Sequence, residues 1–403
     1  MNSELNKTSR SGVRNVVLLG LVSCFADLSS EMVYPLIPLY LTAAFGATPV
    51  LVGIIEGIAE SVASLLKVFS GYLTDRFGHK KRVAWLGYST GLLYKIALIV
   101  AGSWGGVLAA RVIDRIGKGI RTAPRDSLVS ESAEKGSMGR SFGIHKALDM
   151  AGSAVGILAA FLLMSGGNDG DYNYKGIFLW SMIPIAVALV VMFFVRENPV
   201  KPASAVRRER FWKSWRSLDS NLKLYLAVSF LFTLGNSSNA FLLLRAKDVG
   251  FDDRSVVLLY LIYNLVAAVG SIPFGRLSDR IGRKRVLVGG YLLFAAVYLG
   301  FAAVCSQWLM VALFAFYGLY TAMVAGVERA FIAEISPAGL KGTMLGLQST
   351  LVGVALMPAS IIAGLLWNAF GASAPFIFGG AMSSVAAIIL LTLFGKTSKK
   401  IIV

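Results

Sequence analysis

The chain has 403 residues, of which 56% are hydrophobic and only 15% are charged, and its mean hydropathy is +0.68. A soluble globular protein carries about 25% charged residues, so this composition excludes a soluble domain and predicts a protein that crosses a membrane many times. The formal net charge of +17 would suit a nucleic-acid partner, but the placement of the basic residues points elsewhere.

Hydropathy predicts twelve spanning helices, each close to the roughly 20 apolar residues that a bilayer requires. We expect the first six at residues 13–41, 49–74, 83–102, 105–121, 141–164 and 175–195, and the last six at residues 221–244, 255–277, 286–304, 308–332, 343–367 and 374–394. The predicted fold class is an all-α membrane protein of two pseudo-symmetric six-helix bundles. Residues 1–195 form the first bundle, 196–220 a cytoplasmic linker and 221–403 the second bundle.

The basic residues lie mostly on one side of these helices. Thirty-one Lys and Arg residues fall in the termini and in the loops after even-numbered helices, and four fall in the opposite loops. By the positive-inside rule, both termini face the cytoplasm. The surplus of cations therefore sets topology and contacts lipid head groups, and we expect no nucleic-acid partner.

A charged motif occurs twice at an offset of 204 residues. The copies read Gly71-Tyr-Leu-Thr-Asp75-Arg76-Phe-Gly78-His79-Lys80 and Gly275-Arg-Leu-Ser-Asp279-Arg280-Ile-Gly282-Arg283-Lys284. Each lies between two predicted spans, which indicates a short hairpin. The motif resembles the signature loop of the major facilitator superfamily, found between helices 2 and 3 and between helices 8 and 9.

A second resemblance comes from the run Asp114-Arg115-Ile-Gly117-Lys118-Gly119-Ile-Arg121-Thr-Ala-Pro124-Arg125-Asp126. It is similar to a sparsely characterised bacterial branch of that superfamily with the motif D-R-x-G-K-G-x-R-x-x-P-R-D. Arg111 matches the helix 4 arginine that the superfamily associates with proton coupling, although Arg115 stands where a glycine is usual.

These resemblances imply a multi-pass transporter of the bacterial cytoplasmic (inner) membrane that works as a monomer. They also imply that the residues of the charged loops gate the cytoplasmic side. The expected gating residues are Gly71, Asp75, Arg76, Gly78, His79, Asp126, Gly275, Asp279, Arg280, Gly282 and Arg283. His79 has the alternative of being an ordinary solvated loop residue.

Ionisable residues within spans are costly and are functional candidates by default. The first half contains pairs spaced i, i+4, which share a helix face. Two carboxylates close together in a low dielectric are not easily both ionised, so the pKa of one of them rises. A proton carrier that works near neutral pH requires such a raised pKa. The proton-coupling or substrate candidates are Asp27, Glu31, Glu56, Glu60, Arg111, Asp114, Arg115, His145 and Asp149. Glu56 and Glu60 lie early in helix 2, where a structural or partly solvated role is the alternative.

The rest of the chain offers weaker candidates. Pro35 and Pro38 are expected to interrupt helix 1, and Gly152 and Gly156 to allow close helix packing. The superfamily's antiporter motif has a proline where this chain has Ile157, which weakens antiport. The candidates for lining a substrate cavity are Tyr34, Asn236, Asn239, Tyr263, Asn264, Tyr317 and Gln348.

The leading interpretation is a proton-coupled carrier of a small organic solute that works by rocking of two halves. Its direction and the choice between symport and antiport stay open, and the alternative is a multidrug/proton antiporter that exports lipophilic compounds. A membrane enzyme is disfavoured because His-Glu-x-x-His, Gly-x-Ser-x-Gly and nucleotide-binding glycine motifs are absent. Two histidines and two distant cysteines predict no metal and no cofactor, with the proton gradient as energy source.

Overall fold

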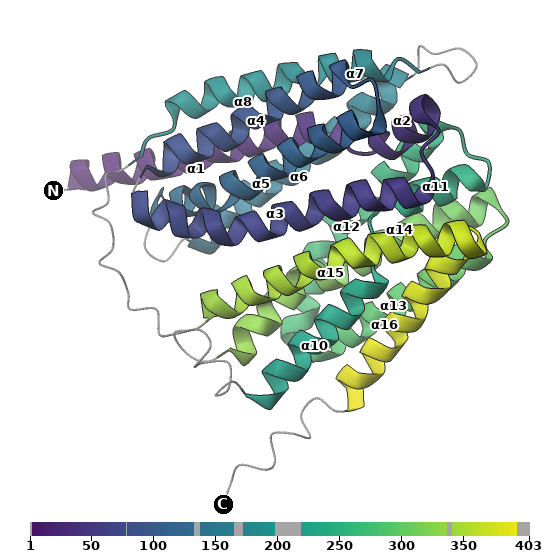
Figure 1. Cartoon of the computed structure of the whole chain (residues 1–403). Coiled ribbons are helices and arrows are strands. Elements are labelled where there is room, and N and C mark those ends of the chain that lie inside the picture. Colours follow the sequence, from purple (N-terminus) through teal and green to yellow (C-terminus); the bar gives the residue numbers. More distant parts are fainter. Residues whose placement is uncertain are drawn as a thin grey trace, which may run out of the picture. The chain divides into compact units, whose positions relative to one another are not determined.

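The structure is a computed structural model that describes residues 2–77, 79–132, 138–164, 172–197, 219–336 and 341–392. Side chains are described for these residues except 2–11, 67–77, 138–140, 142 and 341–343. Within the described residues every regular element is a helix (Figure 1), which confirms the all-α membrane fold. Eleven helical segments there are long and apolar enough to span a membrane. The helix α5 (Trp104–Ser132) is as long as several of these but carries many charges.

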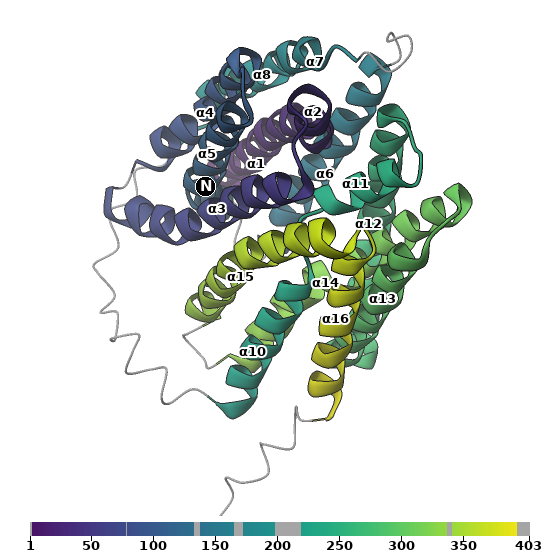
Figure 2. The same cartoon turned by 45° about the vertical axis from the view of Figure 1, so that its right-hand side comes forward.

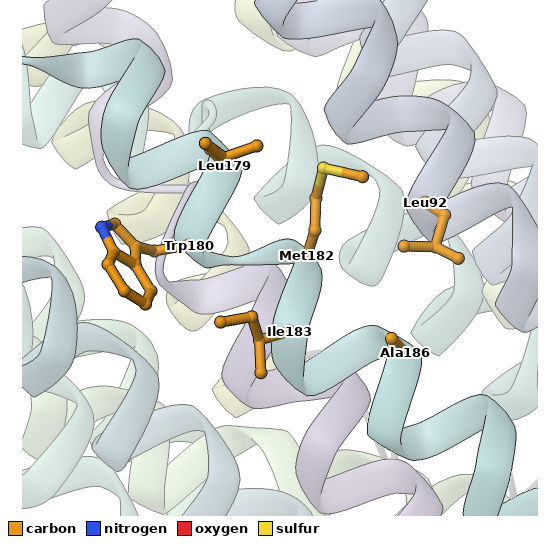
Figure 3. A pocket seen from close by; sticks show the side chains of 6 residues that line it. All are labelled: Leu92, Leu179, Trp180, Met182, Ile183 and Ala186. Atoms are coloured by element: carbon orange, nitrogen blue, oxygen red, sulfur yellow. The ribbon is translucent and has the colours of Figure 1, made fainter.

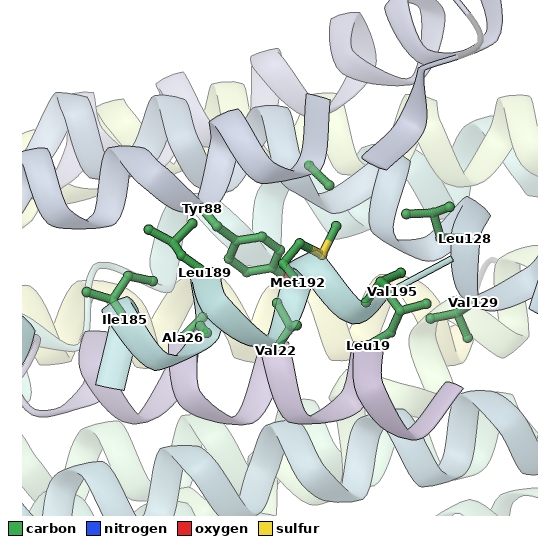
Figure 4. Close-up of a cluster of buried hydrophobic side chains, with 12 residues drawn as sticks. Leu19, Val22, Ala26, Tyr88, Leu128, Val129, Ile185, Leu189, Met192 and Val195 are labelled. Atoms are coloured by element: carbon green, nitrogen blue, oxygen red, sulfur yellow. The ribbon is translucent and has the colours of Figure 1, made fainter. Parts of the chain in front are cut away.

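The chain divides into two compact units, and the first comprises residues 1–46 and 62–205. Its helices are α1 (Asn2–Glu31), α2 (Leu36–Phe45), the second half of α3 (Pro49–Phe77), α4 (Lys80–Val100), α5, α6 (Met138–Leu163), α7 (Tyr174–Trp180) and α8 (Met182–Phe194). A core of buried apolar side chains from α1, α4, α5 and α8 includes Val22, Tyr88 and Met192 (Figure 4). Helix α1 packs mainly against α6 and α8, and α4 against α5.

Helices α1 and α6 approach one another at two glycines. A Cβ added at Gly152 would lie 2.8 Å from the Cα of Cys24, and one at Gly156 would lie 3.0 Å from the Cα of Leu28. The expected packing role of these glycines is therefore present in the structure.

The second unit comprises residues 47–61 and 206–403. Its helices are the first half of α3, α10 (Ser220–Gly235), α11 (Ala240–Asp248), α12 (Asp253–Ile281), α13 (Arg283–Ala303), α14 (Gln307–Ile335), α15 (Lys341–Phe370) and α16 (Ala374–Thr392). Helices α13 and α16 run side by side (Figures 1 and 2). The first half of α3 packs on α15, where the Ser61 hydroxyl donates to the Gly353 carbonyl at 2.6 Å.

Two spans are interrupted at equivalent places. Residues 32–35 separate α1 from α2, and residues 236–239 separate α10 from α11, again at an offset of 204. The first break ends at Pro35, as expected, whereas Pro38, also expected to interrupt the helix, lies in the first turn of α2. The second contradicts the continuous helix predicted at 221–244, and its sequence Asn236-Ser-Ser-Asn239 explains it, because short polar side chains compete for backbone hydrogen bonds.

The signature motif is more helical than predicted. In the second copy Gly275, Asp279 and Arg280 lie in α12, and only Gly282, with a φ of +95°, separates α12 from α13. This left-handed conformation favours glycine. In the first copy Gly71, Asp75 and Arg76 lie in α3, and their side chains are not described. His79 is exposed directly before α4, and Gly78 lies outside the described residues.

Helix α5 extends beyond its predicted end at residue 121 and continues to Ser132, with Pro124 inside it. Asp126 is therefore a helical residue rather than part of a gating loop, and it accepts a hydrogen bond from the neighbouring Arg125 at 2.8 Å. The predicted linker at 196–220 lies outside the described residues, apart from its first two and last two residues.

Candidate functional site

A narrow polar cavity lies wholly within the first unit, where α1, the break after it, α4 and α5 meet. It holds about 20 Å³ of open space, which is room for roughly one water molecule. The described residues that line it are Asp27, Ser30, Glu31, Tyr34, Tyr94, Arg111, Asp114, Arg115, Lys118 and Arg121. All of these side chains are polar or charged, so the cavity is built for polar chemistry.

Helix α5 supplies the cations of this cavity through its spacing. Arg111, Arg115, Lys118 and Arg121 follow one another at intervals of three or four residues, which places them on one face of the helix. The three arginines are buried and Lys118 is exposed. Asp114 lies between them, 3.6 Å from the guanidinium of Arg111 and 3.6 Å from that of Arg115.

Two aromatic rings support the arginines. The guanidinium carbons of Arg111 and Arg115 lie 5.3 and 5.7 Å from the ring centre of Tyr34, which belongs to the break between α1 and α2. The guanidinium carbon of Arg121 lies 4.7 Å from the ring centre of Tyr88. Cation–π contact of this kind stabilises a desolvated guanidinium without neutralising its charge.

Asp27 connects the cavity to α6. Its carboxylate lies 3.9 Å from the Arg121 guanidinium, and it interacts electrostatically with the carboxyl group of Asp149 on α6. Two carboxyl groups close together in a low dielectric are not easily both ionised. Asp149 also accepts a hydrogen bond from Lys146 at 2.7 Å.

His145 extends this network along α1. Its Nε2 lies 2.9 Å from the Ser23 hydroxyl, which in turn lies 3.2 Å from the Tyr88 hydroxyl. Because the Tyr88 ring also contacts Arg121, a chain of polar contacts runs from α6 through α1 and α4 to α5.

Lys95 of α4 belongs to the same charged neighbourhood. Its side chain is fully buried, and it interacts electrostatically with Asp114 and with the three arginines of α5. Within the described residues its ammonium group has no hydrogen-bond partner, and its nearest aromatic contact is the Tyr94 ring at 4.5 Å.

The predicted candidates of the first half fall into two groups. Asp27, Glu31, Tyr34, Arg111, Asp114 and Arg115 line the cavity, and His145 and Asp149 lie beside it through the contacts above. Glu56 is buried and Glu60 half-buried, but both belong to the part of α3 that groups with the second unit.

The candidates of the second unit form a separate, mostly uncharged cluster. The Asn236 amide donates to the Tyr320 hydroxyl at 3.1 Å, and the Tyr317 hydroxyl donates to the Asn239 side chain at 2.9 Å. The Tyr263 ring packs 5.1 Å from that of Tyr317. The break in the helix therefore places both asparagines against tyrosines of α14.

Two further candidates of this unit have local contacts. Asn264 donates to the Tyr260 carbonyl of its own helix at 2.9 Å, and Gln348 is buried. Glu328 of α14 accepts a hydrogen bond from the Ser229 hydroxyl of α10 at 2.9 Å.

A larger apolar hollow of about 430 Å³ lies on the first unit between α4 and the α7–α8 pair. Figure 3 shows its lining, which includes Leu179, Trp180 and Ile183. These three side chains are more than half exposed, as expected where a membrane protein meets acyl chains. Its surface suits lipid rather than a polar solute.

The second signature motif forms ion pairs at the end of α12. Arg283 lies 3.3 Å from Asp279 and 2.9 Å from Glu334 of α14, and it also donates to the Ala330 carbonyl. The motif thus ties three helices of the second unit together at one end.

Comparison with known proteins decides the family. The sequence model of the Major Facilitator Superfamily matches residues 19–244 and 225–401. The chain belongs to the major facilitator superfamily. As a transporter of this superfamily it is not an enzyme, and the resemblance inferred from the signature motif is confirmed.

Several relatives place this transporter within the superfamily. It is 36% identical over 392 residues to an uncharacterized MFS-type transporter of Methanocaldococcus jannaschii, with 96% of both chains covered. It is 25% identical over 274 residues to the fosmidomycin resistance protein of Escherichia coli, covering 66% of this chain and 65% of that one. A crystal structure of a D-xylose–proton symporter has the same fold, with a TM-score of 0.76, 17% identity, and coverage of 97% and 99%.

The transporter's cavity also contains residues that the sequence prediction missed. The sequence prediction ends this helix at Arg121 and does not include Arg121 among the candidate residues. The spacing of Arg121 three residues after Lys118 was the available signal. Ser23 and Tyr88 gave no signal, because a lone Ser or Tyr in an apolar span is usually a packing residue.

Proposed function

We propose that this transporter couples the movement of a small organic solute to protons, with Asp27 as the proton-carrying residue. The observation that supports this proposal is the position of Asp27, which lies 3.9 Å from Arg121 and interacts electrostatically with Asp149. A proton shared between the two carboxyl groups controls how much negative charge faces the arginine.

The coupling follows from this charge balance. When Asp27 is ionised, it neutralises Arg121. When Asp27 is protonated, the attraction is lost and the arginine is available to other groups in the cavity. A proton and a solute that use the same arginine are thereby energetically linked. The break between α1 and α2 begins five residues after Asp27, and a local break supplies a place where such a helix bends.

The polar lining of the cavity supports a specific polar solute over a range of lipophilic compounds. Export remains the alternative direction, because the Escherichia coli relative is a fosmidomycin resistance protein. Uptake is supported by the shared fold with a proton symporter. For location we propose the cytoplasmic membrane with both termini on the cytoplasmic side, on the distribution of Lys and Arg, and a monomer surrounded by lipid.

The test is gradient-driven transport by the purified protein in liposomes. A solute that raises the thermal stability of the wild-type protein is identified first, and its accumulation is then measured with and without an imposed proton gradient. In Asp27→Asn we expect accumulation driven by the gradient to disappear while exchange of labelled for unlabelled solute continues.

Asp219→Asn is the matched control. Asp219 is an exposed carboxylate that caps α10, and asparagine caps a helix equally well, so accumulation should be unchanged. Full gradient-driven accumulation in Asp27→Asn would refute the proposal.

A further inference from the structure

We infer that the polar cavity of the first unit binds the anionic group of the transported solute, a carboxylate or a phosphonate. This inference rests on the proposed transport function and names the class of solute. It is carried by the excess of buried positive charge around the cavity.

The charges that face the cavity do not balance. Among the described lining residues three buried arginines and the exposed Lys118 face three carboxylates, and the fully buried Lys95 adds a fourth buried cation to the neighbourhood. The nearby carboxylates outside the lining are already paired, Asp149 with Lys146 and Asp126 with Arg125. A buried charge without a counter-charge is strongly destabilising, and a bound anion would remove that cost.

The geometry suits an oxyanion. Arg111 and Arg121 are ten residues apart, so the cations of α5 extend along roughly 15 Å of one helix face at 1.5 Å per residue. The rings of Tyr34 and Tyr88 hold three guanidinium groups in place. Fixed guanidinium groups recognise carboxylate and phosphate oxygens through paired N–H donors.

The size of the cavity limits what binds inside it. Open space of about 20 Å³ is room for roughly one water-sized group, so one oxygen atom of an anionic group enters the cavity rather than a complete metabolite. The cavity is therefore a head-group site, and the remainder of the solute lies outside it.

Protonation of Asp27 strengthens this site, because it removes one of the three negative charges and releases Arg121. The charged or titratable groups around Asp27 come from the elements packed on α1, and α8 contributes none. These groups are Glu31 of α1, Lys95 and Tyr88 of α4, Lys118 and Arg121 of α5, and His145 and Asp149 of α6. The anion and the proton thus bind together, which is the thermodynamic requirement for symport.

The experiment compares three four-carbon probes on the purified full-length protein in a neutral detergent at constant ionic strength. The probes are succinate (a dianion), succinamide (its neutral analogue) and 1,4-diaminobutane (a dication), with methylphosphonate as the second anion. Thermal unfolding, followed by tryptophan fluorescence, gives the apparent Kd of each. We expect stabilisation by succinate or methylphosphonate and none by succinamide or diaminobutane.

Two variants change the site in opposite directions. Arg121→Gln should weaken anion binding on the order of tenfold, because a charge-assisted hydrogen bond contributes about 1.5–3 kcal/mol. Asp27→Asn should strengthen it several-fold. Arg82→Gln removes an exposed cation of α4 that does not line the cavity, and it should bind like the wild type.

The outcomes separate this inference from the proposed function. Equal stabilisation by succinamide, or anion stabilisation that is the same in Arg121→Gln as in Arg82→Gln, would overturn the anion site. Tighter anion binding in Asp27→Asn together with unchanged gradient-driven accumulation would keep the anion site and remove Asp27 as proton carrier. If the transported solute is neutral and Asp27→Asn loses its gradient-driven accumulation, Asp27 stays the proton carrier and the anion site is removed.

Discussion

Replacing Gly152 by alanine tests whether the close approach of α1 and α6 holds the first unit together. The added Cβ would lie 2.8 Å from the Cα of Cys24, well inside van der Waals contact, and the atom it meets is backbone. One of the two helices must therefore move. Forced overpacking of this kind costs about 1–3 kcal/mol.

Gly143→Ala in the same helix isolates that cost. Gly143 is exposed, and a Cβ there meets nothing within 4 Å. Both substitutions gain about 1 kcal/mol of helix propensity, so the difference between them reports the clash alone. A difference of about 2 kcal/mol corresponds to roughly 4–8 °C in Tm for a unit of this size.

The assay is thermal unfolding of both variants in detergent, combined with transport in liposomes. Gly152 lies three residues after Asp149, and Cys24 lies three residues before Asp27, so separating the helices also separates the carboxyl pair. We expect Gly152→Ala to unfold at a lower temperature than Gly143→Ala and to lose proton-driven accumulation. Equal Tm values would show that α1 and α6 do not approach as closely as the structure has them.

Two further predictions concern the second unit. Arg245→Gln should lower the free energy of unfolding by about 2 kcal/mol or more, because this buried side chain donates to three carbonyls at the end of α13. Lys284→Gln, which removes an exposed bond to the Leu391 carbonyl, is the control, and equal Tm shifts in the two variants would contradict this role of Arg245. Glu334→Gln removes the exposed ion pair with Arg283, so the free energy of unfolding should change by less than about 1 kcal/mol. We expect the rate of solute transport to change, because Arg283 belongs to the predicted gating residues. An unaltered transport rate would show that this ion pair takes no part in gating.

The fold could be predicted from the sequence because membrane helices are local. Each span is recognised in the sequence as a run of about 20 apolar residues, and the repeated signature motif indicates the family. The failures were local as well. Hydropathy does not register competition for backbone hydrogen bonds, so it does not predict the break at 236–239. It also ends the fourth span at residue 121, whereas α5 continues to Ser132.

The site was predicted less completely, because its contacts join distant parts of the chain. Spacing on one helix identified Asp27 with Glu31, and Arg111 with Arg115. The pairs that define the site are Asp27 with Arg121 and with Asp149, which are 94 and 122 residues apart. Periodicity within a helix carries no information about such pairs, since the packing of α1 against α5 and α6 creates them.

The internal repeat explains why fold and site differ in this respect. The offset of 204 residues that relates the two signature motifs also relates the two helix breaks, so the duplicated sequence encodes the shared backbone. The same offset takes each charged residue of the site to an uncharged one. Asp27 corresponds to Leu231, Arg111 to Ala315, Arg115 to Leu319, Lys118 to Ala322, Arg121 to Ala325 and Asp149 to Gly353. The backbone arrangement is therefore present in both halves of the chain, whereas the charged residues of the site are present only in the first half. Substitutions that abolish proton coupling or anion binding should consequently concentrate in the first unit.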